Sequence, residues 1–152
     1  MAANTAPIFT LTGNFKPTRI NLAYTPTDGV TNATAGTAGQ TSVNIFEVVN
    51  AGTDGTRVDG IRFRVANSAT ASTSGNNVHK VFLSDTAGVN LRIIAETTTT
   101  GVARSATVAG STTLITFDQP IIMSSGQKMY VAQSTYSGAQ DQYDAIAYAG
   151  DY

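Results

Sequence analysis

The sequence contains no cysteine, no tryptophan and only one histidine among its 152 residues. The absence of cysteine excludes disulfides, thiol catalysis and cysteine-based zinc sites. Charged residues make up 12% of the chain, whereas soluble domains typically contain about 25%. Glutamate occurs twice and lysine three times, and both are residues on which helical proteins rely. The composition therefore favours β-structure.

A large charge of either sign and a long apolar run are also missing. The formal net charge is -1, so the basic footprint of a nucleic-acid-binding protein is absent. No apolar run approaches the roughly 20 residues that a membrane helix needs. The opening "MAANTAPIFTLTGNF" lacks the basic and apolar regions of a signal peptide. We expect a single domain that binds neither nucleic acid nor membrane and whose weak self-repulsion permits association with proteins.

Short runs of alternating apolar and polar residues, bounded by Gly, Asn, Asp and Thr, predict strands. In residues 61–65, "IRFRV", Ile61, Phe63 and Val65 share one face and the two arginines share the other. Residues 42–49, "SVNIFEVV", are apolar on both faces, as expected of a central strand. Residues 78–85 and 91–98 flank "TAG", which predicts a hairpin. In this hairpin Leu91, Ile93 and Ala95 are expected to share one face. Pro120 is expected to end a strand or to lie in an edge strand.

These patterns predict an all-β fold of about eight strands, a single antiparallel β-sandwich or barrel. They do not determine the strand order, so jelly-roll and immunoglobulin-like topologies both stay open. Residues 19–152 would form the sandwich. Residues 1–18 would form either an ordinary first strand or an extended N-terminal arm that docks on a neighbouring subunit by adding a strand to a sheet edge. The apolar side chains available for such docking are Ile8, Phe9, Leu11 and Phe15.

Three long segments carry almost no charge and few large apolar side chains. They are "TNATAGTAGQT" (31–41), "VANSATASTSGNN" (65–77) and "RSATVAGSTT" (104–113). Such segments are typical of flexible solvent loops between strands, which cost little entropy. The alternative is that they adapt to a neighbouring molecule.

No catalytic, metal or cofactor site is predicted. His79 lies next to Lys80 and is expected to be an exposed strand residue; Ser84 and Asp85 are near it only in sequence. A Ser–His–Asp site needs three convergent groups, and no G-x-S-x-G motif occurs. Asp-Gly pairs such as the one at Asp54 indicate turns rather than the several oxygens of a calcium site.

Tyrosines crowd the last quarter of the chain. Tyrosine supplies rigid contact area with a polar tip, which suits a protein interface. The alternative is a set of half-buried strand residues. The tyrosines concerned are Tyr130, Tyr136, Tyr143, Tyr148 and Tyr152.

Three stretches together resemble a group of small virion proteins of tailed bacteriophages. They are the opening "APIFTLTGN", the central "VNIFEVVNAGTDGTRVDGIRFRVA" and the terminal "YDAIAYAGDY". The group has an "IFTLTPN"-like opening, a "TVFTAGANGSRVDRIRIKA"-like centre and a terminal "GGDY" or "GGDF". This chain has "TGN" where the group has proline, and "AGDY" instead of a double glycine.

The resemblance implies a structural, non-enzymatic component of the virion: a decoration (cement) protein on the capsid exterior, made in the bacterial cytoplasm and folded as a jelly-roll-like β-sandwich. Its partners would be the major capsid protein and further copies of itself in a trimer. The alternatives are a tail or head-fibre component that contacts the host surface, and a carbohydrate-binding β-sandwich module. The candidate contact residues are Ile8, Phe9, Leu11 and Phe15 of the arm, Arg57, Arg62 and Arg64 of the cationic strand face, and Tyr148 and Tyr152 of the tail.

Overall fold

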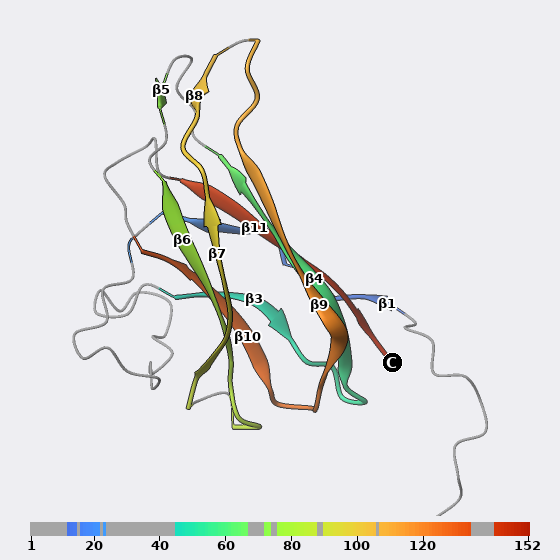
Figure 1. Cartoon of the computed structure of the whole chain (residues 1–152). Coiled ribbons are helices and arrows are strands. Elements are labelled where there is room, and N and C mark those ends of the chain that lie inside the picture. Colours follow the sequence, from blue (N-terminus) through green and yellow to red (C-terminus); the bar gives the residue numbers. More distant parts are fainter. Residues whose placement is uncertain are drawn as a thin grey trace, which may run out of the picture.

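The computed structural model describes residues 12–14, 16–21, 23, 45–66, 72–73, 76–87, 90–105, 107–134 and 142–152. Within these ranges the chain is all-β, as the sequence predicts, and its two main antiparallel sheets lie against each other as a β-sandwich (Figure 1). No helix in this part of the chain is long and apolar enough to cross a membrane. The jelly-roll topology and the N-terminal arm remain predictions.

The first sheet has five strands, with β4 and β11 at its centre. The order β1-β11-β4-β9 is completed by β2, which pairs with β11 further along the same edge as β1. Every pair in the sheet is antiparallel. Its strands are β1 (Thr12–Gly13), β2 (Thr18–Ile20), β4 (Thr56–Val65), β9 (Thr112–Met123) and β11 (Tyr143–Asp151).

The second sheet has four antiparallel strands in the order β3-β10-β6-β7. The predicted hairpin is present, because β6 and β7 pair directly across a turn at Thr86 and Ala87. The strands are β3 (Phe46–Asn50), β6 (Asn77–Leu83), β7 (Arg92–Thr99) and β10 (Lys128–Gln133).

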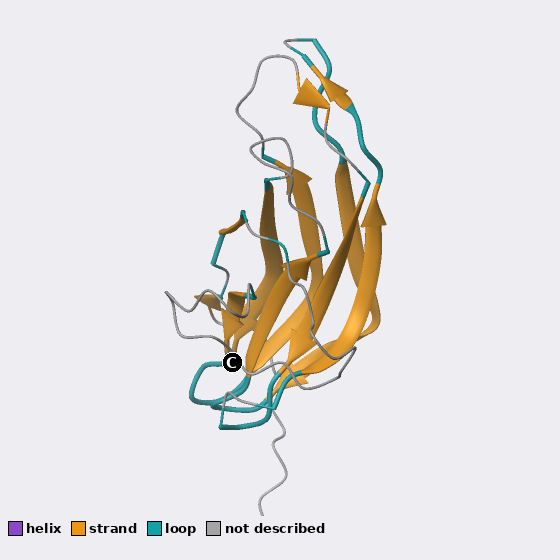
Figure 2. Ribbon diagram, turned by 90° about the vertical axis from the view of Figure 1, so that its left-hand side faces the viewer, coloured by secondary structure: helices purple, strands orange, loops and turns teal. Residues whose placement is uncertain are grey.

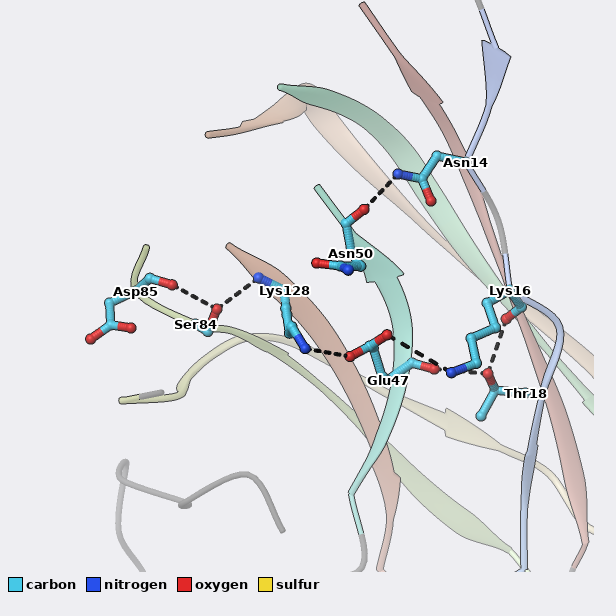
Figure 3. Close-up of polar contacts among 8 residues, drawn as sticks. All are labelled: Asn14, Lys16, Thr18, Glu47, Asn50, Ser84, Asp85 and Lys128. Atoms are coloured by element: carbon cyan, nitrogen blue, oxygen red, sulfur yellow. Dashed lines mark hydrogen bonds and ion pairs between the residues drawn. The ribbon is translucent and has the colours of Figure 1, made fainter. Parts of the chain in front are cut away.

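Strand β3 lies at an edge of the second sheet, so the expectation of a central strand here is wrong. Residues 16–18 cover the open edge of this strand. The amide of Lys16 donates to the carbonyl oxygen of Val48 at 3.3 Å, and the hydroxyl of Thr18 donates to the carbonyl oxygen of Glu47 at 2.8 Å (Figure 3). Strands β1 and β2 of the same N-terminal segment pair with β11 of the other sheet. The segment therefore closes one side of the sandwich. Val48 and Val49 are both buried in the core because the pairing of β3 with β10 skips Val48, a bulge that turns two neighbouring side chains to the same face.

Buried and exposed side chains alternate in β4, and the buried ones face the core. Ile61, Phe63 and Val65 are 0–1% exposed, which confirms the predicted inward face. Each large apolar side chain buried in this way contributes roughly 1.5–3 kcal/mol relative to exposure. The core cluster between the sheets also includes Ile20, Val48, Val49, Val58, Val81, Met123, Met129, Val131 and Tyr143.

Irregularities in β7 and β9 also change which side chains face outward. The pairing of β7 with β6 shifts by one residue between Ala95 and Ile93, which leaves Ile94 unpaired. As a result Ile94 packs against the core, and Ile93 is 37% exposed. The expectation that Ile93 shares a face with Ala95 is therefore wrong.

In β9 the register shifts where Val58 and Gly60 of β4 pair with residues 121 and 116, so Pro120 lies in a bulge of an edge strand. That position agrees with the prediction for this proline, because an edge strand need not donate every amide.

Two of the three uncharged segments meet in space. Strand β5 (Ser72–Thr73) pairs antiparallel with β8 (Ala103–Arg104) as a separate two-stranded ribbon. Both views place this ribbon beyond one end of the sandwich (Figures 1 and 2). Beyond β8 the chain reverses through a turn in which the amides and carbonyls of Ser105 and Val108 bond reciprocally at 3.2 and 3.3 Å. The third segment, 31–41, lies outside the described residues.

Candidate functional site

The outward side of the five-stranded sheet carries the arginines singled out from the sequence. Arg57, Arg62 and Arg64 all lie on β4 with their side chains away from the core. The register places Arg62 between Ile146 of β11 and Leu114 of β9. We call this surface the arginine face. It comprises Arg57, Asp59, Arg62 and Arg64 of β4, Arg19 of β2, Asp144, Ile146 and Tyr148 of β11, and Thr112, Leu114, Thr116, Asp118 and Ile122 of β9.

Large apolar side chains gather on the arginine face. Leu114 is 49%, Ile122 is 59% and Tyr148 is 44% exposed. Only two other large apolar side chains in the described part of the chain are exposed, Ile93 and Val108. An apolar surface interleaved with polar groups on a rigid sheet is typical of a protein-binding site.

The four arginines of this face fall into two groups. Arg57 is paired with Asp59, with Nη2 and Oδ1 2.7 Å apart, and Arg19 is paired with Asp144 at 2.5 Å. The hydrogen bond to Asp59 and its charge raise the pKa of Arg57 above its ordinary value. Arg62 and Arg64, by contrast, have no ion pair or side-chain hydrogen bond to any described residue. Two guanidinium groups are therefore available for a partner.

The lysines of the opposite sheet are in ion pairs. Lys80 pairs with Glu96 at 2.6 Å. Glu47 lies between Lys128, 3.0 Å away, and Lys16, 3.8 Å away (Figure 3). The hydrogen bond to Glu47 raises the pKa of Lys128. All three lysines of the chain are thus paired, whereas Arg62 and Arg64 of the arginine face have no such partner among the described residues.

The remaining predicted contact residues have different surroundings. Ile8, Phe9, Leu11 and Phe15 lie outside the described residues. Tyr152 follows β11 at one corner, where its amide donates to the carbonyl oxygen of Gly55 at 3.3 Å. Among the other tyrosines that were considered for an interface, Tyr130 is 7% and Tyr143 is 0% exposed. Tyr136 lies outside the described residues. Of the described tyrosines, Tyr148 is the one whose side chain is available on the arginine face.

His79 is buried, so the expectation of an exposed strand residue is wrong. Its side chain is 0% exposed and lies between two rings of the other sheet. The ring of Phe63 is stacked on it at 4.5 Å, and Tyr143 meets it edge-on at 4.4 Å. Neither ring nitrogen has a hydrogen-bond partner among the described residues. Burial lowers the pKa of His79 to about 4, because an apolar environment disfavours the imidazolium.

The sequence neighbours of His79 take part in turn structure. The hydroxyl of Ser84 donates to the carbonyl oxygen of Asp85 at 2.8 Å and accepts from the amide of Lys128 at 2.7 Å (Figure 3). Asp85 accepts from the amide of Ala87 within the same turn at 3.0 Å. These groups therefore do not form a relay with His79. The described residues also contain no cluster of three or more His, Asp or Glu side chains that would hold a metal ion.

The residues that flank the arginines were missed in the sequence. The sequence around these residues shows the ordinary alternation of a strand. Only the pairing of β9 and β11 with β4 places Leu114, Ile122 and Ile146 beside the arginines. For His79 a signal was present in the sequence, because it alternates in phase with the apolar Val81 and Leu83, which pack in and against the core.

Comparison of the chain with protein-family models, with curated proteins and with solved structures finds no match.

Proposed function

We propose that this protein is a structural virion component of a tailed bacteriophage, a capsid decoration protein that binds the outside of the head and reinforces the shell by bridging capsid subunits. Two things support the proposal: the resemblance of the three stretches to small phage virion proteins, and the arginine face. The arginine face is the observation that carries it, because exposed Leu114 and Tyr148 beside unpaired arginines indicate a surface made for another protein.

The mechanism is binding without a chemical step. Strands β4, β9 and β11 hold the side chains of the arginine face on one hydrogen-bonded sheet, so little conformational freedom is lost when a partner docks. Burial of the apolar side chains stabilises the complex by roughly 25 cal/mol per Å². In a closed trimer, three such faces would engage the shell together, and many weak contacts would combine through avidity.

The test is immunogold labelling of phage particles from the source of the chain, with an antibody against this protein. Label distributed over the heads is the expected result. Label confined to the tails would replace the proposal with a tail or fibre component that contacts the host. Particles without label would overturn the virion assignment, and a glycan-binding screen would then test the carbohydrate-binding alternative.

A further inference from the structure

We propose that the arginine face takes an acidic protein surface, with carboxylates that engage Arg62 and Arg64. This inference rests on the proposed function for the identity of the partner, the major capsid protein. The chemistry of the contact follows from the side chains themselves.

The first argument is the distribution of charge. The face carries four arginines, Arg19, Arg57, Arg62 and Arg64, against three aspartates, Asp59, Asp144 and the outward Asp118 of β9. The whole chain has a formal net charge of -1. The face therefore keeps an excess of positive charge on a slightly acidic protein, which favours the approach of an acidic partner to that side.

The second argument is the environment of Arg62. Its cross-strand neighbours, Ile146 and Leu114, are both apolar. A partner that covers Leu114 also removes the Arg62 guanidinium from water, which costs free energy unless the partner supplies an acceptor. A carboxylate offsets this cost best, because its two oxygens match the planar fork of the guanidinium. Because the Arg62 guanidinium is costly to bury without an acceptor, this position favours a partner that places a carboxylate opposite it.

The third argument concerns the occupant. A second copy that docked through the same face would bring arginines against arginines, which is unfavourable. Nucleic acid is bound through many phosphate contacts, whereas Arg62 and Arg64 are the only arginines of this face without an acidic partner among the described residues. The mixture of two cations with exposed leucine, isoleucine and tyrosine therefore fits a protein surface.

The experiment measures binding of fluorescently labelled poly-L-glutamate to the full chain by anisotropy, at low and at moderate salt. The double variant R62Q/R64Q should bind at least tenfold more weakly than the wild type, and the wild-type affinity should fall as salt rises. The matched control is R57Q, on the same strand and face but already paired with Asp59; its affinity should change by less than about threefold. Equal weakening in R57Q, or no weakening in the double variant, would overturn the inference.

A comparison with nucleic acid tests the class of the partner. If the wild type binds oligo(dT) more tightly than poly-L-glutamate, with the same dependence on Arg62 and Arg64, the assignment to a protein surface is wrong.

Binding to phage particles separates this inference from the proposed function. If the heads carry the protein but R62Q/R64Q binds them as well as the wild type does, the inference fails and the decoration role stands. If poly-L-glutamate binding depends on the two arginines but particles carry no label, the acidic-partner chemistry stands and the virion assignment fails. Unchanged thermal unfolding of the variants would show that these exposed substitutions leave the fold intact.

Discussion

The side-chain amide of Asn14 donates a hydrogen bond to Oδ1 of Asp151, 2.7 Å away and 137 positions further along the chain. The hydroxyl of Thr56 donates to the same oxygen and accepts from the amide of Gly52 at 3.0 Å. Asn14 also donates to the carbonyl oxygen of Asn50 at 2.7 Å (Figure 3). The corner thus joins β1, β4 and β11 to the end of β3.

This corner contains residues from all three stretches that resemble the phage proteins: Asn14 from the opening, Thr56 from the centre and Asp151 from the end. Their side chains bind one another, and Thr56 is 0% exposed. We infer that these residues serve folding. A partner would be met by side chains elsewhere on the same strands.

Replacing Asp151 by alanine should destabilise the fold by about 2 kcal/mol, because the buried Thr56 hydroxyl and the Asn14 amide lose their shared acceptor. Chemical denaturation at neutral pH measures this change. The control is D54A in the neighbouring exposed turn, where the effect should stay within about 0.5 kcal/mol. Equal effects of the two substitutions would show that the network contributes nothing.

The stability of the protein should fall as the pH drops from about 6.5 to about 4. In this window an unfolded chain binds a proton at His79, whose ordinary pKa is 6.5, whereas the folded chain does not, because its pKa is about 4. The stabilisation is therefore complete above pH 6.5 and is lost progressively towards pH 4, by roughly 3 kcal/mol at 1.36 kcal/mol per pKa unit. Its cross-strand neighbours, Gln133 and Thr97, are uncharged.

Denaturation at pH 7.5 and pH 4.5 tests this dependence, with H79L and H79Q as variants that do not titrate at this position. Carboxylates contribute equally to all three proteins, so the wild type should lose more stability on acidification than either variant. A second readout is the NMR titration of the His79 ring in the wild type, which should stay neutral down to about pH 5. An ordinary titration near pH 6.5 would contradict the burial argument.

The N-terminal segment should divide into a part needed for folding and a part that is not. Residues 12–20 contribute β1, β2, the Asn14 contacts and the fully buried Ile20. Deletion of residues 1–20 should therefore cost several kcal/mol, whereas deletion of residues 1–11 leaves these contacts in place. If Ile8, Phe9 and Leu11 form a docking arm, the shorter deletion should weaken binding to phage heads without lowering the melting temperature. Normal binding by that variant would show that the arm is not used.

Gly126 should not tolerate alanine. Its φ is +86°, in the left-handed region, and a Cβ there would lie 2.2 Å from the carbonyl oxygen of Thr86. G126A should lower stability by at least about 2 kcal/mol, because it adds backbone strain and forces apart the β9–β10 and β6–β7 turns. The control is S125A at the preceding exposed position, which should be nearly neutral. Thermal unfolding compares the two.

The sequence predicted the fold class and several strand faces correctly because alternation is a local property. The burial of Ile61, Phe63 and Val65 and the β6–β7 hairpin follow from period-two patterns and turn residues. The central position assigned to β3 was wrong, because a bulge at Val48 turns two neighbouring valines to the core and so gives an edge strand the same apolar run. Ile93 was misplaced because a bulge shifts the parity of β7, and local alternation does not reveal a bulge.

The candidate site, too, could be predicted only in part from the sequence. The outward direction of Arg62 and Arg64 was determined by their alternation with core residues, and the absence of disulfides by the absence of cysteine. Only the tertiary structure decided that Arg62 lies between Ile146 and Leu114, that His79 is enclosed by Phe63 and Tyr143, and that Asn14 reaches Asp151. Each of these relations depends on which distant strands pair and in what register. That choice is made by packing and hydrogen bonding across the whole sandwich, and short-range periodicity carries no information about it.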